Sequence, residues 1–388
     1  MKNVGEVYKK GLCNSCGVCQ AVCGKNAITY KYDLYGFLKP VVSENCINCG
    51  ACVKACPGEK YYLNEQKEVC EYFTLHSTDD MLRNKSASGG FTTEFLCYLL
   101  NKHIVDYCVV IPRVKNSLAV EPVITKDIDQ IKESCGSKYI PVQYGSVLSQ
   151  IKNSNDRYAL VVLPCQEYAI KKYLKKGTER IFFVTLMCNH MSGNSASRMI
   201  LSRRAAKGNV FSIDYRGEGW PGKMKVNDEV IDSFRNIYGG AFGRYFFNFR
   251  CKMCNNHFGK SSVMTVADPY YITENGAGNT CCICRDSTVR TYIEEMIQEN
   301  QIENVDLDIT NDLIERSYKG IFIAENYIPR LLWLRKKLKL AIPNGSEKFL
   351  KNVSLNRNDY VEFLSLYKDR LIGRLLSAET KIKYRGKD

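Results

Sequence analysis

The sequence lacks the segments that carry a chain into a membrane or out of the cell. Its first residues, MKNVGEVYKKGLC, are polar and contain none of the apolar core of a secretory signal. No run of 18 apolar residues occurs, so no transmembrane helix is expected. We therefore expect a cytoplasmic protein, in which thiols stay reduced and do not form a disulfide framework.

Two nucleotide-binding signatures are also missing. Neither GxGxxG nor GxxxxGK[ST] is present, so neither a Rossmann nor a P-loop domain is indicated. The composition does not favour disorder, because 45% of the residues are hydrophobic and 25% are charged, close to globular averages. With 388 residues the chain is long enough for two or three domains.

Cysteine, in contrast, is abundant, with 19 residues. In a reduced chain these are metal ligands, catalytic groups or small buried side chains. Eight of them form an internal repeat at a displacement of 33 residues. The two runs are Cys13, Cys16, Cys19 and Cys23, and Cys46, Cys49, Cys52 and Cys56. The segment between them, AITYKYDLYGFLKPVVSEN, predicts two short strands around a turn at 33–36.

The repeated CxxCxxCxxxC spacing indicates two 4Fe–4S clusters. Three thiolates from one tight loop bind one cubane, and the fourth cysteine, carried away by the following helix, binds the other cluster. Cluster one is then held by Cys13, Cys16, Cys19 and Cys56, and cluster two by Cys46, Cys49, Cys52 and Cys23. The alternative is a pair of zinc sites, although structural zinc usually uses two separated CxxC pairs. Radical SAM chemistry would need C-x3-C-x2-C, and Asn26 stands where its third cysteine would be.

Over residues 11–58 the sequence resembles the bacterial two-cluster 4Fe–4S ferredoxins. Pro57 follows the second run as in that family, whereas Gly24 stands where proline is usual after the first. Proline shapes the chain there but ligates nothing, so the departure leaves the ligand set intact.

The rest of the chain predicts an α/β fold. Apolar strands at 158–163 and 181–187 are each followed by a helical pattern, which implies a parallel sheet covered on both faces. We expect three parts: an α+β ferredoxin-like domain over 1–64, a mixed α/β domain over 65–310 with a sub-boundary near 155, and a basic helical segment over 311–388.

Four further cysteines fit one site. Cys165 and Cys188 each follow a predicted strand, and ligands gather at the carboxyl ends of parallel strands. Cys251 and Cys254 form a CxxC pair, and together the four provide the thiolates for a third cluster. The alternative is that the single cysteines are buried packing residues. The remaining seven, Cys70, Cys97, Cys108, Cys135, Cys281, Cys282 and Cys284, are expected in the core, the last three in a buried strand.

A glycine turn, Ser88, Gly89 and Gly90, precedes a predicted helix at 91–103. Glycines let backbone N–H groups approach a phosphate, and a helix N-terminus favours negative charge. The same turn also occurs at helix entries that bind nothing.

Taken in order, these segments resemble the beta subunit of coenzyme F-420 hydrogenase and dehydrogenase. The residues that carry the resemblance lie within 86–272: SASGGFTTEFLCYLL, CGSKYIPVQ, LVVLPCQEYAIKKYL, FFVTLMCNHMSG and FRCKMCNNHFGKSSVMTVADPYY. The resemblance implies FAD with a 4Fe–4S cluster beside it. Ser88, Gly89 and Gly90 would hold the flavin phosphates, Lys138, Pro164 and Gln166 would line the flavin pocket, and Cys165, Cys188, Cys251 and Cys254 would bind the cluster.

Lys138 and His190 are the candidate catalytic residues. His190 is a candidate proton donor near the flavin, although an isolated histidine is more often a satisfied polar group. Three family motifs differ on the flavin side: Val162-Leu163 replaces Gly-Thr, Asn189-His190 replaces His-Gly, and Ala267 replaces the glycine before Asp268.

The resulting hypothesis is an iron–sulfur flavoprotein oxidoreductase. It would pass electrons between a low-potential donor, such as ferredoxin or reduced coenzyme F-420, and an organic substrate or partner enzyme subunit, in either direction. The alternative is a flavin-free iron–sulfur subunit that wires or scaffolds a larger complex.

The net charge of +14 lies mostly in the last 59 residues, with 15 Lys/Arg against 6 Asp/Glu. These helices are a solvated face or a docking face for an acidic redox partner. Nucleic-acid binding is not expected, because no groove motif with interleaved aromatics accompanies the charge.

Overall fold

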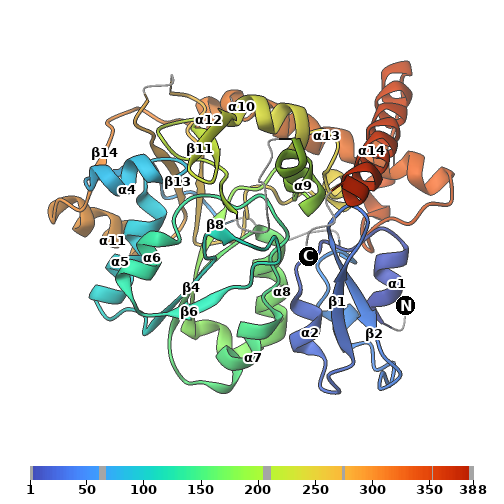
Figure 1. The fold of residues 1–388 in the computed structure, drawn as a ribbon, viewed down its shortest axis with the longest axis horizontal. Helices are drawn as coiled ribbons and strands as arrows, with labels where there is room; N and C mark the ends of the chain where they lie inside the picture. Colours follow the sequence, from blue (N-terminus) through green and yellow to red (C-terminus); the bar gives the residue numbers. More distant parts are fainter. Residues whose placement is uncertain (1–2, 61–66, 204–210, 273–275, 352, 384–388) are drawn as a thin grey trace.

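The computed structural model describes residues 3–60, 67–203, 211–272, 276–351 and 353–383. One large mixed sheet crosses the middle of the molecule, and the cysteine-rich segment of the N-terminal 60 residues lies beside the helices that cover one of its faces (Figure 1). Two smaller sheets, of two and four strands, complete the architecture. The expected mixed α/β class is confirmed.

The cysteine-rich segment folds as a hairpin flanked by short helices. Its elements are α1 (Val4–Lys9), α2 (Val18–Val22), β1 (Ile28–Tyr32), β2 (Leu38–Val42) and α3 (Ala51–Lys54). The strands β1 and β2 pair antiparallel, as expected from the sequence. The Asp33 carboxylate closes the turn by accepting hydrogen bonds from the backbone N–H groups of Tyr35 and Phe37, both at 2.9 Å.

The large sheet has the order β14-β3-β13-β12-β8-β7-β4-β6. Its strands are β3 (Glu71–Ser77), β4 (Tyr107–Val110), β6 (Val123–Thr125), β7 (Tyr158–Val162), β8 (Ile181–Leu186), β12 (Met264–Ala267), β13 (Thr280–Cys284) and β14 (Ile302–Asn304). The four central strands, β4, β7, β8 and β12, are parallel, and this part of the prediction is confirmed. Antiparallel neighbours β6 and β13 make the whole sheet mixed, because hairpin-like connections can add strands at either side.

Helices cover both faces of this sheet. One face packs on α5 (Phe91–Asn101) and α11 (Ser287–Gln298). The other packs on α7 (Gly145–Asn153), α8 (Pro164–Leu174) and α9 (Asn194–Arg203). Shorter helices at the edges are α4 (Asp80–Lys85), α6 (Ile128–Glu133) and η1 (Lys175–Arg180). Adjacent residues of one strand therefore enter different cores, as Cys108 and Val109 do.

A four-stranded sheet lies beside the second face. It contains β5 (Val114–Lys115), β9 (Ser212–Asp214), β10 (Lys223–Val226) and β11 (Glu229–Ser233). It leads through α10 (Phe234–Ile237) and η2 (Tyr238–Phe242) into η3 (Phe249–Met253), the turn that carries Cys251.

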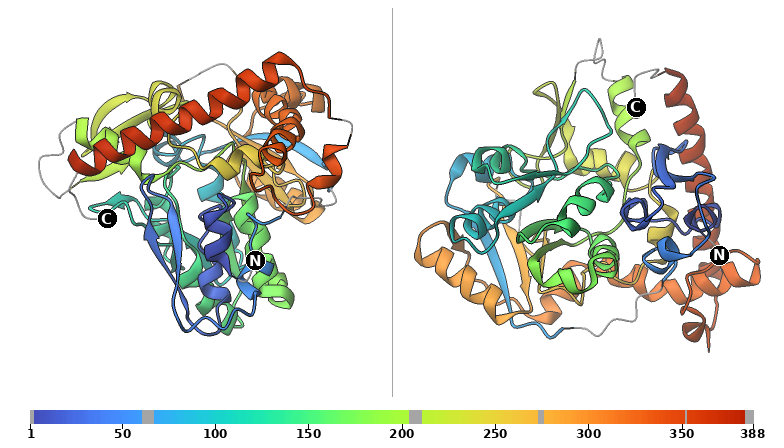
Figure 2. Two further views of the ribbon diagram at one scale, coloured as in Figure 1. Left: turned by 90° about the vertical axis from the view of Figure 1, so that its right-hand side faces the viewer. Right: turned by 90° about the horizontal axis from the view of Figure 1, so that it is seen from below.

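The C-terminal part is helical, as expected. It comprises α12 (Asn311–Ser317), α13 (Lys319–Lys337), η4 (Glu347–Leu350) and the long α14 (Arg357–Lys383). Helix α14 runs alongside the cysteine-rich segment (Figure 2), where the Tyr35 hydroxyl donates to the Arg370 carbonyl at 3.4 Å. Among the described residues, no helix combines the length and apolar character needed to cross a lipid bilayer.

Of the seven cysteines expected in the core, five are buried there and two are not. Cys70 is exposed and Cys135 is only half-buried, because both lie outside the regular strands and helices, in connecting segments. Cys97 and Cys108 are buried in the core, and Cys281, Cys282 and Cys284 form the buried strand β13. The expected domain boundary near 64 lies outside the described residues.

Candidate iron–sulfur and cofactor site

The cysteine-rich loops bring Cys56 back to the first run. Burial is the main cause of the raised pKa of Cys13 and of Cys16, which for Cys16 is about 12, and the neighbouring Cys56 thiol is the second cause. Burial and then Cys16 raise the pKa of Cys19. The thiols of Cys13, Cys16, Cys19 and Cys56 therefore lie together, in the grouping expected for cluster one.

The second grouping follows the same logic. Burial raises the pKa of the Cys52 thiol, and its neighbours Cys23 and Cys46 add to that rise. Cys23, the last cysteine of the first run, lies near the second run, and Cys56, the last cysteine of the second, lies near the first. This exchange is the one that the bacterial ferredoxin pattern predicts. Cys49 is exposed.

The first cysteine loop packs tightly onto the α/β domain. Gly17, between Cys16 and Cys19, has a φ of +74°, and a Cβ there would lie 2.4 Å from Gln143 Cβ. Only glycine permits this left-handed backbone and this approach. The contact is at the start of α7, which places the cluster-one loop directly against the sheet domain.

Four more cysteines lie beyond this contact. Burial raises the pKa of Cys165, and the charges that add to it come from Cys188, Cys16, Cys251 and Cys254. Burial, then Cys251 and Cys254, does the same for Cys188. Strand ends, helix α8 and turn η3 thus converge on one group of half-buried cysteines, and the buried Cys16 of the first loop adjoins it.

The described residues contain no group of three or more His, Cys, Asp or Glu side chains close enough to hold a single metal ion. A tetrahedral zinc site with Zn–S bonds of about 2.3 Å brings its thiolates together around one atom. A cubane needs a wider arrangement, because each thiolate binds a different iron. Thiol groups spaced for a cubane are therefore compatible with the absence of a single-ion site among the described residues.

A cavity of about 280 Å³ lies at the carboxyl end of the central strands. Its wall includes Leu163 and Gln166 after β7, Met187 after β8, and Ala267 and Asp268 at the end of β12. Leu163 and Gln166 flank Cys165 in the chain, and Met187 precedes Cys188. The cavity and this group of cysteines therefore share two adjacent strand ends, the usual place for ligands in such a sheet.

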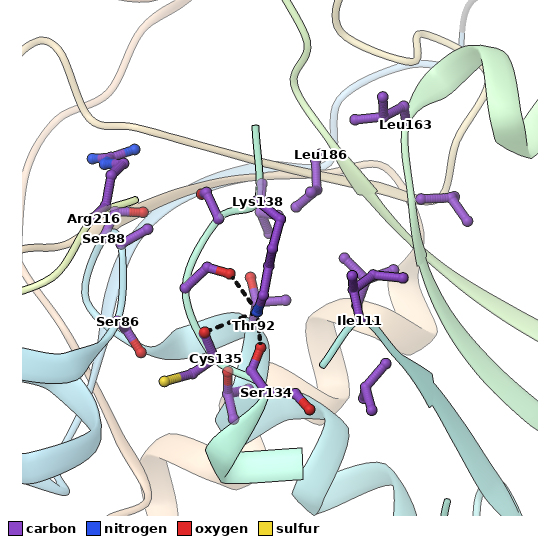
Figure 3. A pocket seen from close by; sticks show the side chains of 18 of the residues that line it. Ser86, Ser88, Thr92, Ile111, Ser134, Cys135, Lys138, Leu163, Leu186 and Arg216 are labelled. Carbon is purple, nitrogen blue, oxygen red and sulfur yellow. Dashed lines mark hydrogen bonds between the residues drawn. The ribbon is translucent and has the colours of Figure 1, made fainter. Parts of the chain in front are cut away.

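Lys138 is held at the cavity wall by the end of helix α6 (Figure 3). Its ammonium donates to the carbonyl oxygens of Cys135 at 3.0 Å and Gly136 at 2.9 Å, and also to that of Ser134. Burial lowers the pKa of Lys138 to about 8. All three ammonium protons of Lys138 already have acceptors. Lys138 therefore contributes positive charge to the cavity but has no proton free to donate to a ligand.

Arg216 and Asp268 form a buried ion pair in the cavity wall that the sequence interpretation missed. Arg216 Nη1 donates to both carboxylate oxygens, at 3.0 and 2.9 Å, and Nε donates to the Pro221 carbonyl at 3.0 Å. Burial by itself lowers the pKa of Arg216, but Asp268 outweighs it and the pKa is raised. The available signal was Asp268, a carboxylate directly after a buried strand. Arg216 lies in a glycine-rich turn, and no sequence pattern there indicates a ligand site.

The other predicted residues take different places. Ser88 and Gly90 line the cavity, whereas Gly89 packs against Asn279, just before β13, and a Cβ on Gly89 would lie 2.7 Å from Asn279 Cα. Pro164 is the first residue of α8 and is buried. Gln166 caps that helix, because its Oε1 accepts a hydrogen bond from the Leu163 N–H at 2.8 Å.

His190 does not line the cavity. Its Nε2 lies 3.1 Å from the Phe242 carbonyl, and its ring stacks on Tyr238. Burial lowers its pKa to about 3, so the imidazole is neutral and its Nε2–H is engaged by a backbone oxygen. This geometry suits a structural residue better than a proton donor, and we leave His190 out of the proposed site.

The cavity wall fits a polar or anionic ligand group, such as a flavin phosphate, because two of its buried polar atoms lack a partner among the described residues. Ser86 Oγ and Arg216 Nη2 are buried polar atoms of its wall, and neither has a hydrogen-bond partner among the described residues. Buried polar groups usually have partners, so a polar or anionic ligand group would satisfy them. The volume is near the lower limit of small-molecule sites, about 300 Å³.

Comparison with known proteins agrees with this arrangement. Residues 72–149 match the family model described as coenzyme F-420 hydrogenase/dehydrogenase, beta subunit N-term, and residues 155–309 match the corresponding C terminus. Residues 6–57 match a 4Fe–4S dicluster domain.

Individual relatives share less than a third of their aligned residues with this chain. The chain is 29% identical to a subunit of the F(420)H(2) dehydrogenase of Methanosarcina mazei over 48% of this chain and 55% of that protein. It thus spans about half the length of that relative. A protein of Methanocaldococcus jannaschii described as uncharacterized is 21% identical over 81% of this chain and 96% of its own.

A chain of the F-420-reducing [NiFe] hydrogenase complex from Methanosarcina barkeri has the same fold. The superposition has a TM-score of 0.53 at 14% identity, and it covers 68% of this chain and 92% of that one. With its two family models, its dicluster domain and this fold, the chain belongs to the coenzyme F-420 hydrogenase/dehydrogenase beta subunit family of iron–sulfur oxidoreductase subunits.

Proposed function

We propose that this chain is an iron–sulfur flavoprotein subunit that moves electrons between a redox partner at its ferredoxin-like segment and an FAD in the 280 Å³ cavity. A third 4Fe–4S cluster on Cys165, Cys188, Cys251 and Cys254 would join the two. The observation that carries the proposal is the continuity of thiols from Cys16 to Cys165, and from Cys165 to the cavity wall at Leu163 and Gln166.

The chain's own residues would do two things. The cysteines would hold three clusters in succession, and thiols that burial keeps protonated, such as those of Cys13 and Cys165, would release their protons on metal binding. Lys138 and the Arg216–Asp268 pair give the cavity a positive wall for an anionic group. Bound FAD would supply the exchange between one-electron and two-electron transfer.

The named relatives are subunits of dehydrogenase and hydrogenase enzymes. We extend this to a partner for the present chain: a redox protein such as ferredoxin, or a larger enzyme subunit, with reduced F-420 as a candidate substrate at the cavity. A reducing compartment, the cytoplasm, is part of the proposal, because cluster assembly needs free thiols.

A second function is favoured by one feature of the cavity. Val162, Leu163 and Ala267, the residues that depart from the family motifs, all line it and present apolar side chains. If these side chains exclude the flavin, the chain is a flavin-free iron–sulfur subunit of a larger complex.

One purification distinguishes the two functions. The protein is isolated without oxygen, and iron, acid-labile sulfide and acid-released flavin are measured per chain. The first function requires about twelve irons and about one FAD, whereas the second requires the same iron without flavin.

The third cluster is tested in the same preparation. Cys254→Ser is expected to remove about four irons and to spare the ferredoxin pair, since each cubane holds four. Cys70→Ser is the matched control, because Cys70 is exposed and belongs to no thiol group described above. Loss of about eight irons in the Cys254 variant would overturn the ligand grouping.

A further inference from the structure

Arg250 is a fully buried guanidinium between two of the cysteine groups. Its exposed fraction is 0%, the lowest value for an arginine among the described residues. It directly precedes Cys251 in turn η3, and it stands where the ferredoxin-like segment meets the sheet domain.

Its hydrogen bonds join the ligand segments of both groups. Nε donates to the Gly58 carbonyl at 2.8 Å, and Nη2 donates to the Lys60 carbonyl at 2.7 Å, both just after Cys56. Nη1 donates to the Met253 carbonyl at 2.9 Å, just before Cys254. The Arg250 side chain thus joins, through hydrogen bonds, the segment after Cys56 to the CxxC pair of Cys251 and Cys254.

These hydrogen-bond partners are neutral, and within the described part of the chain no carboxylate forms an ion pair with Arg250. A buried charge that lacks a counter-charge is costly, so a negative charge of another kind is expected nearby. The thiol groups are the candidates, because Arg250 directly precedes Cys251 and its hydrogen bonds end on carbonyl groups just before Cys254 and just after Cys56.

We propose that Arg250 is a positioning residue that serves as the shared counter-charge of cluster one and the third cluster, and that it raises the reduction potentials of both. The part of this inference that concerns the third cluster rests on the proposed function, whereas the part that concerns cluster one does not need the third cluster. Reduction of a cubane adds one electron, which takes the charge of the cluster with its four thiolates from about −2 to −3. A buried cation stabilises the more negative, reduced form, so its removal lowers the potential.

Cluster two provides the internal reference. Among the described residues, the side-chain hydrogen bonds of Arg250 go to Gly58, Lys60 and Met253, and none goes to the Cys46 loop or to Cys52. The local effect of Arg250 should therefore leave cluster two unchanged, whereas a general loosening of the fold would affect all three clusters.

The experiment is a redox titration of the full anaerobic chain followed by electron paramagnetic resonance. The Cys254→Ser variant, which retains only the ferredoxin pair, assigns the signals. In Arg250→Met we expect the equilibrium between oxidised and reduced forms of cluster one and the third cluster to shift about tenfold towards oxidised, a fall of about 59 mV for a one-electron couple. Cluster two should keep its potential. Arg250→Lys, which keeps the charge, should restore most of the shift even if it binds fewer carbonyl groups.

Two further variants complete the test. Lys252→Met removes a neighbouring cation that influences Cys251 and rests on the Phe247 ring at 4.7 Å, so it should move only the third cluster. Arg285→Met removes another buried arginine, whose Nη1 donates to Thr265 Oγ1 at 2.8 Å within the sheet domain, and it should move none.

Unchanged potentials in Arg250→Met, or an equal shift in all three clusters, would overturn the inference. Eight irons in the wild-type chain would instead refute the third cluster of the proposed function. In that case the shift of cluster one alone still decides the role of Arg250.

Discussion

The buried Arg216–Asp268 pair allows a quantitative test of the cavity wall. The side chains are 3% and 14% exposed, and Arg216 Nη1 lies within 3.0 Å of both carboxylate oxygens. The Arg216 guanidinium also lies over the Phe234 ring, 4.7 Å from its centroid. Removal of one partner leaves the other charge buried without compensation, which typically costs about 3–5 kcal/mol.

We expect Asp268→Asn to lower the free energy of unfolding by about 3 kcal/mol, at the lower end of that range because asparagine keeps one acceptor oxygen. Arg216→Met should cost a similar amount. The double variant should cost less than the sum of the singles by about 2 kcal/mol, since each change removes the same interaction. Urea unfolding followed by circular dichroism measures all three values, with the slope m unchanged.

The matched control is an exposed ion pair on helix α12. Arg316 and Asp312 are 70% and 73% exposed, so Asp312→Asn should change the free energy of unfolding by less than about 0.5 kcal/mol. If Asp268→Asn is as mild as this control, or if the singles add within about 0.5 kcal/mol, the pair does not stabilise the cavity wall as argued.

Two other predictions concern the same cavity. Gly89→Ala should lower the free energy of unfolding by about 2 kcal/mol or more, because Gly89 has a φ of +75° and its Cβ would lie 2.7 Å from the Asn279 backbone. Gly90 has a φ of +80°, but the nearest atom to its Cβ would be a side-chain atom at 3.2 Å. Gly90→Ala should therefore lower the free energy of unfolding only by the roughly 1 kcal/mol that a left-handed backbone costs alanine. Thermal or urea unfolding of the two variants checks this difference, and equal losses would contradict it. Burial lowers the pKa of Lys138 from 10.5 to about 8, so between these pH values the unfolded chain binds a proton that the folded chain lacks. The free energy of unfolding should therefore rise with pH across this window, by up to about 3 kcal/mol at about 1.4 kcal/mol per pKa unit, and Lys138→Met should abolish that rise; an identical pH dependence in both proteins would show that Lys138 does not titrate there.

Much of the fold followed from local patterns. The apolar runs of β7 and β8, each followed by a helix, indicated parallel strands, and the structure has them side by side in a sheet covered on both faces. Such runs are visible because burial on both faces removes the usual alternation of polar residues. Pairing partners outside the four parallel strands were not predictable, because an antiparallel strand such as β13 can join from any distance along the chain.

The candidate site divides in the same way. Cys165 and Cys188 were predictable, since a residue directly after a parallel strand lies at a known edge of the sheet. Arg216 was not, because it reaches the cavity from the four-stranded sheet through a glycine-rich turn. His190 and Gln166 had the right residue type for chemistry, but their hydrogen bonds go to backbone groups. Which polar groups remain free for a ligand depends on contacts between segments distant in sequence.

By itself the sequence determined the ferredoxin-like segment, because its chemistry depends on the spacing of cysteines within single loops, and loop geometry is local. It also determined the residue types at the strand ends. Only the tertiary structure decided that Cys16 adjoins Cys165, that Arg250 lies between two thiol groups, and that Arg216 and Asp268 share a wall with Lys138. Those arrangements arise from the packing of segments far apart in the chain, as the contact of Asn248 Nδ2 with the Cys13 carbonyl at 3.0 Å illustrates, and such packing follows from the whole core and not from any one motif.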